Sequence, residues 1–114
     1  MLPGNIFWAS VRLVKRPASE THPVVFFKTL TKNENDGVLV FGGSSKLDES
    51  FDLLHTIDFA GPRYKRLHHF GLDSKTYFYW EFFQLIYPVQ YKSPARYSLH
   101  EDDLLSLLES AYLI

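Results

Sequence analysis

The aromatic segment between Ser74 and Tyr91 limits the fold of this chain more than any other part of the sequence. Its aromatic members before Pro88 are Tyr77, Phe78, Tyr79, Trp80, Phe82, Phe83 and Tyr87. Aromatic side chains pack well on the pleated surface of a sheet, and Pro88 closes the run because proline cannot donate to a strand ladder. A long helix would also bury these residues. The aromatic density nevertheless favours one bent strand or two strands.

Three earlier segments also have patterns typical of strands. In residues 5–14, the alternating set from Phe7 to Leu13 is the cleaner apolar face, which we expect to point inward. Residues 23–30 are β-branched and aromatic, with proline at the first strand position, where it fits. Asp36-Gly37 then predicts a hairpin turn before a short buried strand over residues 38–41.

Two segments have helical spacing. Leu47, Phe51 and Leu54 predict a short middle helix from about Lys46 to His55, and residues 58–73 then read as a loop. Ser98 and Glu101 fit a capping box, followed by a leucine-rich stripe. This pattern predicts a C-terminal helix over about 99–112 that lies against the sheet. The sequence therefore predicts a mainly β fold with a short middle helix and a C-terminal α-helix.

Composition narrows the class of protein. A length of 114 residues fits one domain, residues 1–114. The chain has no cysteine, which excludes disulfides and thiolate metal sites. The first residues lack a signal-peptide pattern and no apolar run is long enough for a bilayer, so we expect a cytoplasmic protein without a membrane partner. A net charge of -1 argues against a general nucleic-acid coat and leaves room for a local basic groove.

Several stretches, in order, carry a family resemblance. Residues 4–9 are similar to the sequence Gly-Asp-Ile-Val-Trp-Ala, which forms the first strand in one family of small β proteins. Residues 22–25 stand where that family has Arg-Pro-Val-Val. Residues 38–45 are similar to the family's next strand, which ends in Ser or Thr, and residues 96–104 are similar to its closing helix start. Residues 71–84 match a "Gly-Leu … Ser … Gln" strand more loosely. The chain thus resembles the MazF/PemK (Kid) family of type II toxin–antitoxin systems.

The resemblance implies an SH3-like β-barrel of the type that this family shares with the CcdB toxins. It also implies a metal-independent endoribonuclease that needs no cofactor and cleaves single-stranded RNA, chiefly mRNA. The partners would be a second copy of the chain, in a homodimer, and a cognate antitoxin that is acidic and partly disordered. Two departures stand out: His22 replaces the family's arginine, and the segment from Lys46 to Phe70 is longer.

RNA cleavage without a metal requires a base for the 2'-hydroxyl, stabilisation of the phosphorane and an acid for the leaving oxygen. A histidine side chain ordinarily titrates near neutral pH, so His22 could act as acid or base. Ser44 and Ser45 occupy the place of the family's active Ser/Thr, and Arg16 or Arg12 could supply a cation. The alternatives remain a surface-loop role for His22 and a turn or helix-cap role for the serines.

A second cluster combines basic residues with an aromatic. Its members are Arg63, Tyr64, Lys65, Arg66, His68 and His69. Cations can meet phosphates while a ring stacks on a base, so the cluster suits single-stranded RNA. The alternative is a solvated loop with unrelated charges. Adjacent histidines without cysteine or carboxylate ligands at suitable spacing do not predict a metal site.

Three functional hypotheses follow. The first is the RNA-cleaving toxin. The second is a non-catalytic SH3-like module that binds a protein or peptide, which the replacement of arginine by His22 favours. The third is a CcdB-like topoisomerase poison with the same barrel and no RNA chemistry.

Overall fold

The computed structural model describes residues 1–12 and 18–114 and contains six strands, three short 3-10 helices and one α-helix. The strands are β1 (Asn5–Arg12), β2 (Ser19–Thr29), β3 (Val38–Ser44), β4 (Leu53–Asp58), β5 (Lys75–Ile86) and β6 (Tyr97–Ser98). The helices are η1 (Glu34–Asp36), η2 (Pro62–Phe70), η3 (Pro88–Gln90) and α1 (Glu101–Ser110). The mainly β fold with a C-terminal helix is therefore confirmed.

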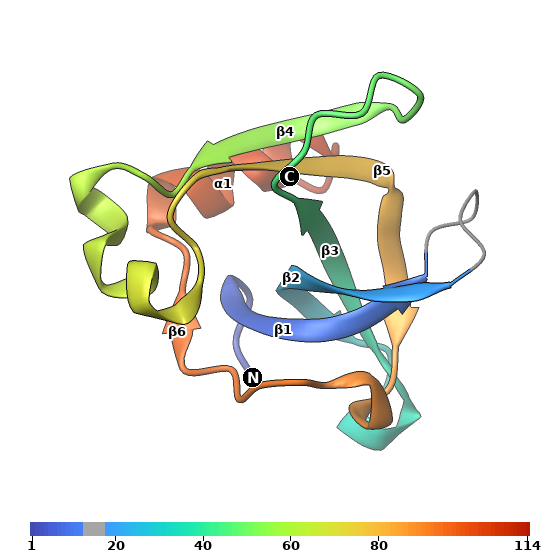
Figure 1. The fold of residues 1–114 in the computed structure, drawn as a ribbon. Helices are drawn as coiled ribbons and strands as arrows, with labels where there is room; N and C mark the ends of the chain where they lie inside the picture. The colour runs from blue at the N-terminus through green and yellow to red at the C-terminus, as the bar shows by residue number, and fades with distance from the viewer. Residues whose placement is uncertain (13–17) are drawn as a thin grey trace.

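All six strands join one antiparallel sheet, in the order β4-β5-β3-β2-β1-β6. The sheet curls strongly, as in a small β-barrel (Figure 1). The aromatic segment forms one bent strand, β5. Its register with β3 changes from Phe41 opposite Phe83 to Gly43 opposite Phe78, so β5 contains more residues than β3 between these two pairs. The extra residues let β5 turn sharply, so that its first half pairs with β4 while its second half follows β3.

The three strands β1, β2 and β3 carry buried side chains on both faces. Val24 and Val25, which point to opposite faces, are 0% and 1% exposed. In β1, the face that was expected to point inward is buried, as at Phe7, but Ile6 on the opposite face is also buried. Burial on both faces explains why these strands read as nearly continuous apolar runs.

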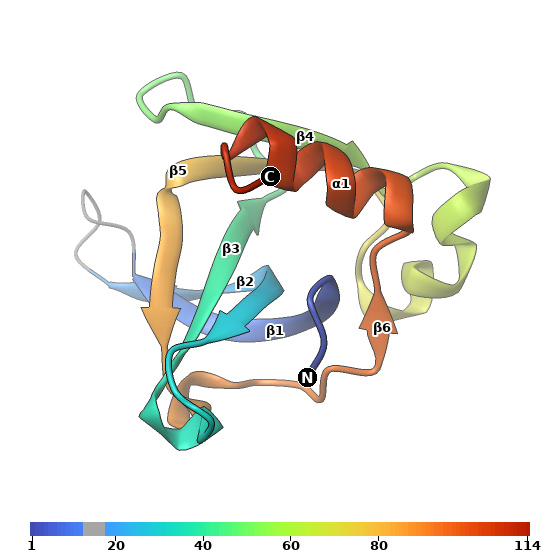
Figure 2. The same cartoon turned by 180° about the vertical axis from the view of Figure 1, so that it is seen from behind.

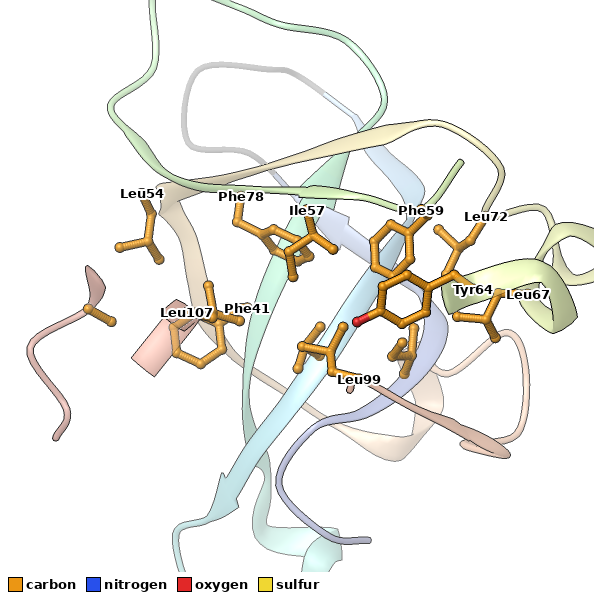
Figure 3. Close-up of a cluster of buried hydrophobic side chains, with 13 residues drawn as sticks. Phe41, Leu54, Ile57, Phe59, Tyr64, Leu67, Leu72, Phe78, Leu99 and Leu107 are labelled. Atoms are coloured by element: carbon orange, nitrogen blue, oxygen red, sulfur yellow. The ribbon is translucent and has the colours of Figure 1, made fainter. Parts of the chain in front are cut away.

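The buried side chains on the two faces of β1, β2 and β3 form two hydrophobic cores. Helix α1 covers one of them and runs alongside β4 (Figure 2). Its Leu107 is fully buried in a cluster that includes Phe41 and Ile57 (Figure 3). On the other face, Phe7 belongs to a second cluster, against which Tyr91 packs edge-on at 4.8 Å between ring centroids. No helix within residues 1–12 and 18–114 has the length and apolar character needed to cross a bilayer.

The prediction of a short middle helix over residues 46–55 is wrong. Asp48 instead forms a local turn, in which its Oδ1 accepts from the backbone amide of Ser50 at 2.9 Å, and β4 begins at Leu53. Phe51 is buried against the Tyr79 ring, whereas Leu47 is 56% exposed. The apolar spacing therefore did not define one helical face.

The capping box at the start of the C-terminal helix is also wrong. The Ser98 hydroxyl belongs to β6, where it accepts from the Asn5 side-chain amide at 2.7 Å. His100 is the N-cap instead, and its Nδ1 accepts from the backbone amide of Asp102 at 3.2 Å. The helix accordingly begins at Glu101.

The turn predicted at Asp36-Gly37 is confirmed. The Gly37 amide donates to the Glu34 carbonyl, and Gly37 adopts a φ of 108°, which favours glycine. The expected loop over residues 58–73 is only partly right, because it contains the 3-10 helix η2. That helix runs from Pro62 to Phe70, and Gly71, which follows it, adopts a left-handed conformation.

Candidate functional site

A surface pocket of about 410 Å³ lies where β1, β2 and the end of β3 meet the chain before β5. We call it the strand pocket. Its lining includes Glu20, His22, Ser44, Ser45, Lys46 and Asp73. Three side chains that the sequence analysis selected, those of His22, Ser44 and Ser45, therefore share one cavity.

Strand register explains this meeting of distant residues. Val24 of β2 lies opposite Gly42 of β3. The same register, continued by two residues, places His22 opposite Ser44, on the same side of the sheet. The ladder between β3 and β5 adds Ser44 opposite Tyr77, which brings the start of β5 to the same edge of the pocket.

His22 and Glu20 form a pair of acid–base groups on β2. The His22 Nε2 lies 3.5 Å from Glu20 Oε2. The His22 side chain is only 12% exposed, whereas that of Glu20 is 51% exposed. The imidazole also contacts the Phe82 ring, with 5.7 Å between centroids. The imidazole is therefore fixed in the pocket wall, with a carboxylate beside it at the surface.

The chain turns immediately after β3, at the two serines. Ser44 Oγ accepts from the backbone amide of Lys46 at 3.2 Å, a local bond that reverses the chain. Ser45 is exposed, and Lys46 lines the same pocket. Two serines and one lysine therefore line the cavity together with the histidine and the carboxylate.

Trp8 fixes the opposite wall of the strand pocket. Its indole Nε1 donates to the Phe70 carbonyl at 2.9 Å, and its backbone amide donates to Ser93 Oγ at 2.8 Å. Gly71 follows η2 with a φ of 92°, and an added Cβ would lie 3.2 Å from the indole ring. The tight fit between this glycine and Trp8 holds the end of η2 against β1.

A second pocket, of about 300 Å³, lies between η2 and the chain leading into α1. We call it the basic pocket. Its basic lining residues are Arg63, Arg66, Arg96 and His100. Within the described residues no carboxylate lines this pocket. Arg63 and Arg66 come from the cluster that the sequence analysis proposed for RNA, and Arg96 and His100 join them only through the fold.

The expectation that the Tyr64 ring could stack on a base is wrong. Tyr64 is 5% exposed, and its ring packs on Phe59 with 4.7 Å between centroids (Figure 3). Its hydroxyl donates to Asp103 Oδ2 and accepts from the backbone amide of His100. Burial and the bond to Asp103 raise the pKa of Tyr64 well above its ordinary value. The residue anchors η2 to α1 as a neutral phenol.

The remaining members of this cluster separate into two groups. His68 is half-buried and its Nε2 lies 2.8 Å from the Phe59 carbonyl oxygen, so the ring donates there as part of the scaffold. Lys65 and His69 are exposed but do not line the basic pocket. Arg12 is exposed at the end of β1 and lines neither pocket. Arg16 lies outside the described residues.

Sequence reasoning missed Glu20, Lys46 and Arg96. Glu20 stands two residues before His22, so a strand through both would have placed them on one face. Lys46 directly follows the two serines. No sequence pattern linked Arg96 to η2, because only the packing of β6 beside η2 brings them together.

Comparisons with known proteins did not identify a relative of this chain. A scan of known protein families, a search of curated proteins and a search of solved structures each found no match. Among the residues that the structure describes, no group of three or more His, Asp or Glu side chains is placed to hold a metal ion.

Proposed function

We propose that this protein is a toxin-like endoribonuclease that cleaves single-stranded RNA in the strand pocket. One observation supports the proposal above all: His22, Ser44 and Ser45 line one cavity together with Glu20 and Lys46. These groups provide an acid–base pair, hydroxyl donors and a cation, which are the functions that RNA cleavage without a metal requires.

The reaction needs two proton transfers. The 2'-oxygen attacks the phosphorus, so a P–O2' bond forms and the P–O5' bond breaks, leaving a 2',3'-cyclic phosphate and a free 5'-hydroxyl. The proton of the 2'-hydroxyl passes to the base, and the acid delivers a proton to the leaving 5'-oxygen. Glu20 and His22 stand side by side at the pocket and can share these roles.

The phosphorane carries extra negative charge on its equatorial oxygens. Lys46 and Ser45 line the same pocket, and their ammonium and hydroxyl groups would donate to those oxygens in this mechanism. Lysine acts here as a point charge and lacks the two-pronged geometry of arginine. Lys46 would thus supply part of the charge that the family's arginine supplies.

The test uses purified protein and RNA labelled at its 5' end, with and without a chelator. We expect cleavage in both conditions, with cyclic phosphate at the new 3' ends. Glu20→Gln should slow cleavage by roughly 100-fold, the lower range for loss of a general acid or base. The matched control is Glu49→Gln, an exposed residue that does not line the pocket. Equal rates in the two variants would contradict the proposal.

Expression in cells tests the toxin role. Growth should arrest with the natural chain, and His22→Ala or Ser45→Ala should relieve the arrest. A co-expressed acidic antitoxin, which the resemblance implies, should relieve it without any substitution. Full toxicity in both variants would defeat the catalytic assignment.

A non-catalytic binding module is the second candidate, and the burial of His22 favours it. A side chain that is 12% exposed and packed on Phe82 can serve as part of a rigid pocket wall. This candidate predicts that purified protein leaves RNA intact. It also predicts that His22→Gln changes the midpoint of urea denaturation, and that neither the natural chain nor this variant cleaves RNA.

A further inference from the structure

The basic pocket is built differently from the strand pocket, and the proposed cleavage chemistry does not use it. Three arginines converge there from η2 and from the chain before α1. The whole chain has a net charge of -1, so three arginines at one pocket are a local gathering of basic residues.

The arginines are not equally available. Arg63 already contacts Asp102 and Asp103 at the start of α1, at 3.8 and 3.5 Å. For Arg66 and Arg96, the described part of the chain shows no ion pair, and both are exposed. Two planar guanidinium groups are therefore free to bind an anion, and their geometry suits a phosphate.

Aromatic rings connect the two pockets. Trp8 lines the strand pocket and lies 6.1 Å from the Phe70 ring, between centroids. Phe70 lies 4.8 Å from Tyr97, which lines the basic pocket. All three residues are half-buried and pack against the core cluster. A row of half-buried aromatic residues between two pockets suits the bases of one unpaired strand, since a base can stack on an accessible ring.

We propose that the basic pocket binds a second phosphate of the same RNA strand, several bonds away from the phosphate in the strand pocket, with a base resting on Phe70 between them. This inference rests on the proposed function for its choice of RNA. In this proposal Arg66 and Arg96 bind the second phosphate. They would therefore strengthen the binding only of a strand that is long enough to reach both pockets.

The experiment measures binding without cleavage. A fluorescent ten-nucleotide strand with 2'-O-methyl groups cannot undergo attack by the 2'-oxygen, so its Kd reports binding alone. Arg66→Gln/Arg96→Gln should raise this Kd by about tenfold or more, because two charge-assisted contacts are lost. The slope of log Kd against log salt should also become shallower, by roughly 0.7 for each lost phosphate contact.

The matched control is Lys28→Gln/Lys32→Gln, which removes the same charge from residues outside both pockets. Its Kd should stay within about twofold of the natural chain, because exposed charges outside the pockets are screened by salt. A third variant, Phe70→Leu, keeps an apolar side chain but should raise the Kd by about fivefold or more, because a stacking surface is lost.

The outcomes separate this inference from the proposed function. If the control and Arg66→Gln/Arg96→Gln weaken binding equally, or neither weakens it, the inference is overturned. It is also overturned if the pocket binds decaglutamate in an arginine-dependent way while the ten-mer does not bind. If the ten-mer binds as expected and unmodified RNA stays uncut, RNA binding at the basic pocket stands and the nuclease proposal fails.

Discussion

The two pockets differ in how their side chains are held. In the strand pocket, His22 and Ser44 lie on neighbouring strands whose register fixes their separation, and acidic, basic and neutral groups face one cavity. In the basic pocket, arginines extend from a 3-10 helix and a loop, and their charge has one sign. Long arginine side chains tolerate such a scaffold, whereas proton transfer requires closely fixed positions.

This contrast suggests a division of labour. In the proposed mechanism, the groups that would exchange protons lie on the hydrogen-bonded ladder, and the groups that would bind the RNA backbone lie on the more irregular chain. The link between them is the contact of Trp8 with Phe70, where β1 meets the end of η2. The contrast can be tested by weakening each scaffold separately.

The largest expected effect concerns the scaffold of the basic pocket. Tyr64→Ala should lower the free energy of unfolding by about 3–5 kcal/mol, because it removes a buried ring and the bond to Asp103. Urea denaturation measures the change. Tyr112→Ala removes the same ring from a residue that is 87% exposed, and should stay within about 0.5 kcal/mol of the natural chain. Similar losses would mean that η2 is not anchored through Tyr64.

The next effect concerns the scaffold of the strand pocket. In Gly43→Ala the new Cβ would lie 2.4 Å from Thr76 Cγ2, a buried β-branched side chain. Such overpacking should lower the free energy of unfolding by about 1–3 kcal/mol. In the control Gly61→Ala, the nearest atom lies 4.0 Å from the new Cβ, so stability should hardly change. An unchanged urea midpoint for Gly43→Ala would show that the Thr76 side chain can move aside without loss of stability.

A smaller effect is expected at the link between the pockets. Trp8→Phe keeps a ring but leaves the Phe70 carbonyl without the indole donor, which should lower stability by about 1 kcal/mol. Circular dichroism during urea denaturation avoids the lost tryptophan fluorescence. Trp80→Phe is the control, at a residue that is 40% exposed. If Trp8→Phe also lowers ten-mer binding, the two pockets act on one strand.

The smallest effect separates the pH dependence of the fold from that of the strand pocket. Burial lowers the pKa of His55 below its ordinary value of 6.5, partly opposed by Asp103. The unfolded chain therefore takes up this proton first as the pH falls. The stability that depends on neutral His55 is present above about pH 6.5 and is lost on acidification towards the folded-state pKa.

The measurement is the urea midpoint between pH 7.5 and 5. His55→Gln should flatten this dependence, because the titrating group is gone. The pH profile of RNA cleavage should keep its shape in this variant, since His55 does not line the strand pocket and contacts Ser110 of α1 instead. An unchanged slope of stability against pH would exclude His55 as a source of acid sensitivity.

The sequence predicted the β elements well where burial is strong on both faces. The runs around Val25 and Val40 are apolar almost without interruption, and both became central strands. The sequence failed around residues 46–55, where Phe51 packs on β5 and Asp48 makes a local turn. Helical spacing over so few residues was fortuitous, because long-range packing decided the local structure.

For the candidate site, the sequence predicted which residues have suitable chemistry but not all of their neighbours. His22, Ser44 and Ser45 were selected by type and position, and they do line one pocket. Tyr64 was selected by type alone and became a core residue, since a phenol near an aromatic core gains more from burial than from solvent.

By itself, the amino-acid sequence determined that a mainly β chain would close with an amphipathic helix, since side-chain pattern and local turns decide such elements. Tertiary structure alone decided that Ser44 and Lys46 join His22 at one cavity, and that Arg96 lines the same pocket as Arg66. The physical reason is that strand register and the docking of η2 on β1 depend on contacts between residues far apart in the chain, which no local pattern encodes.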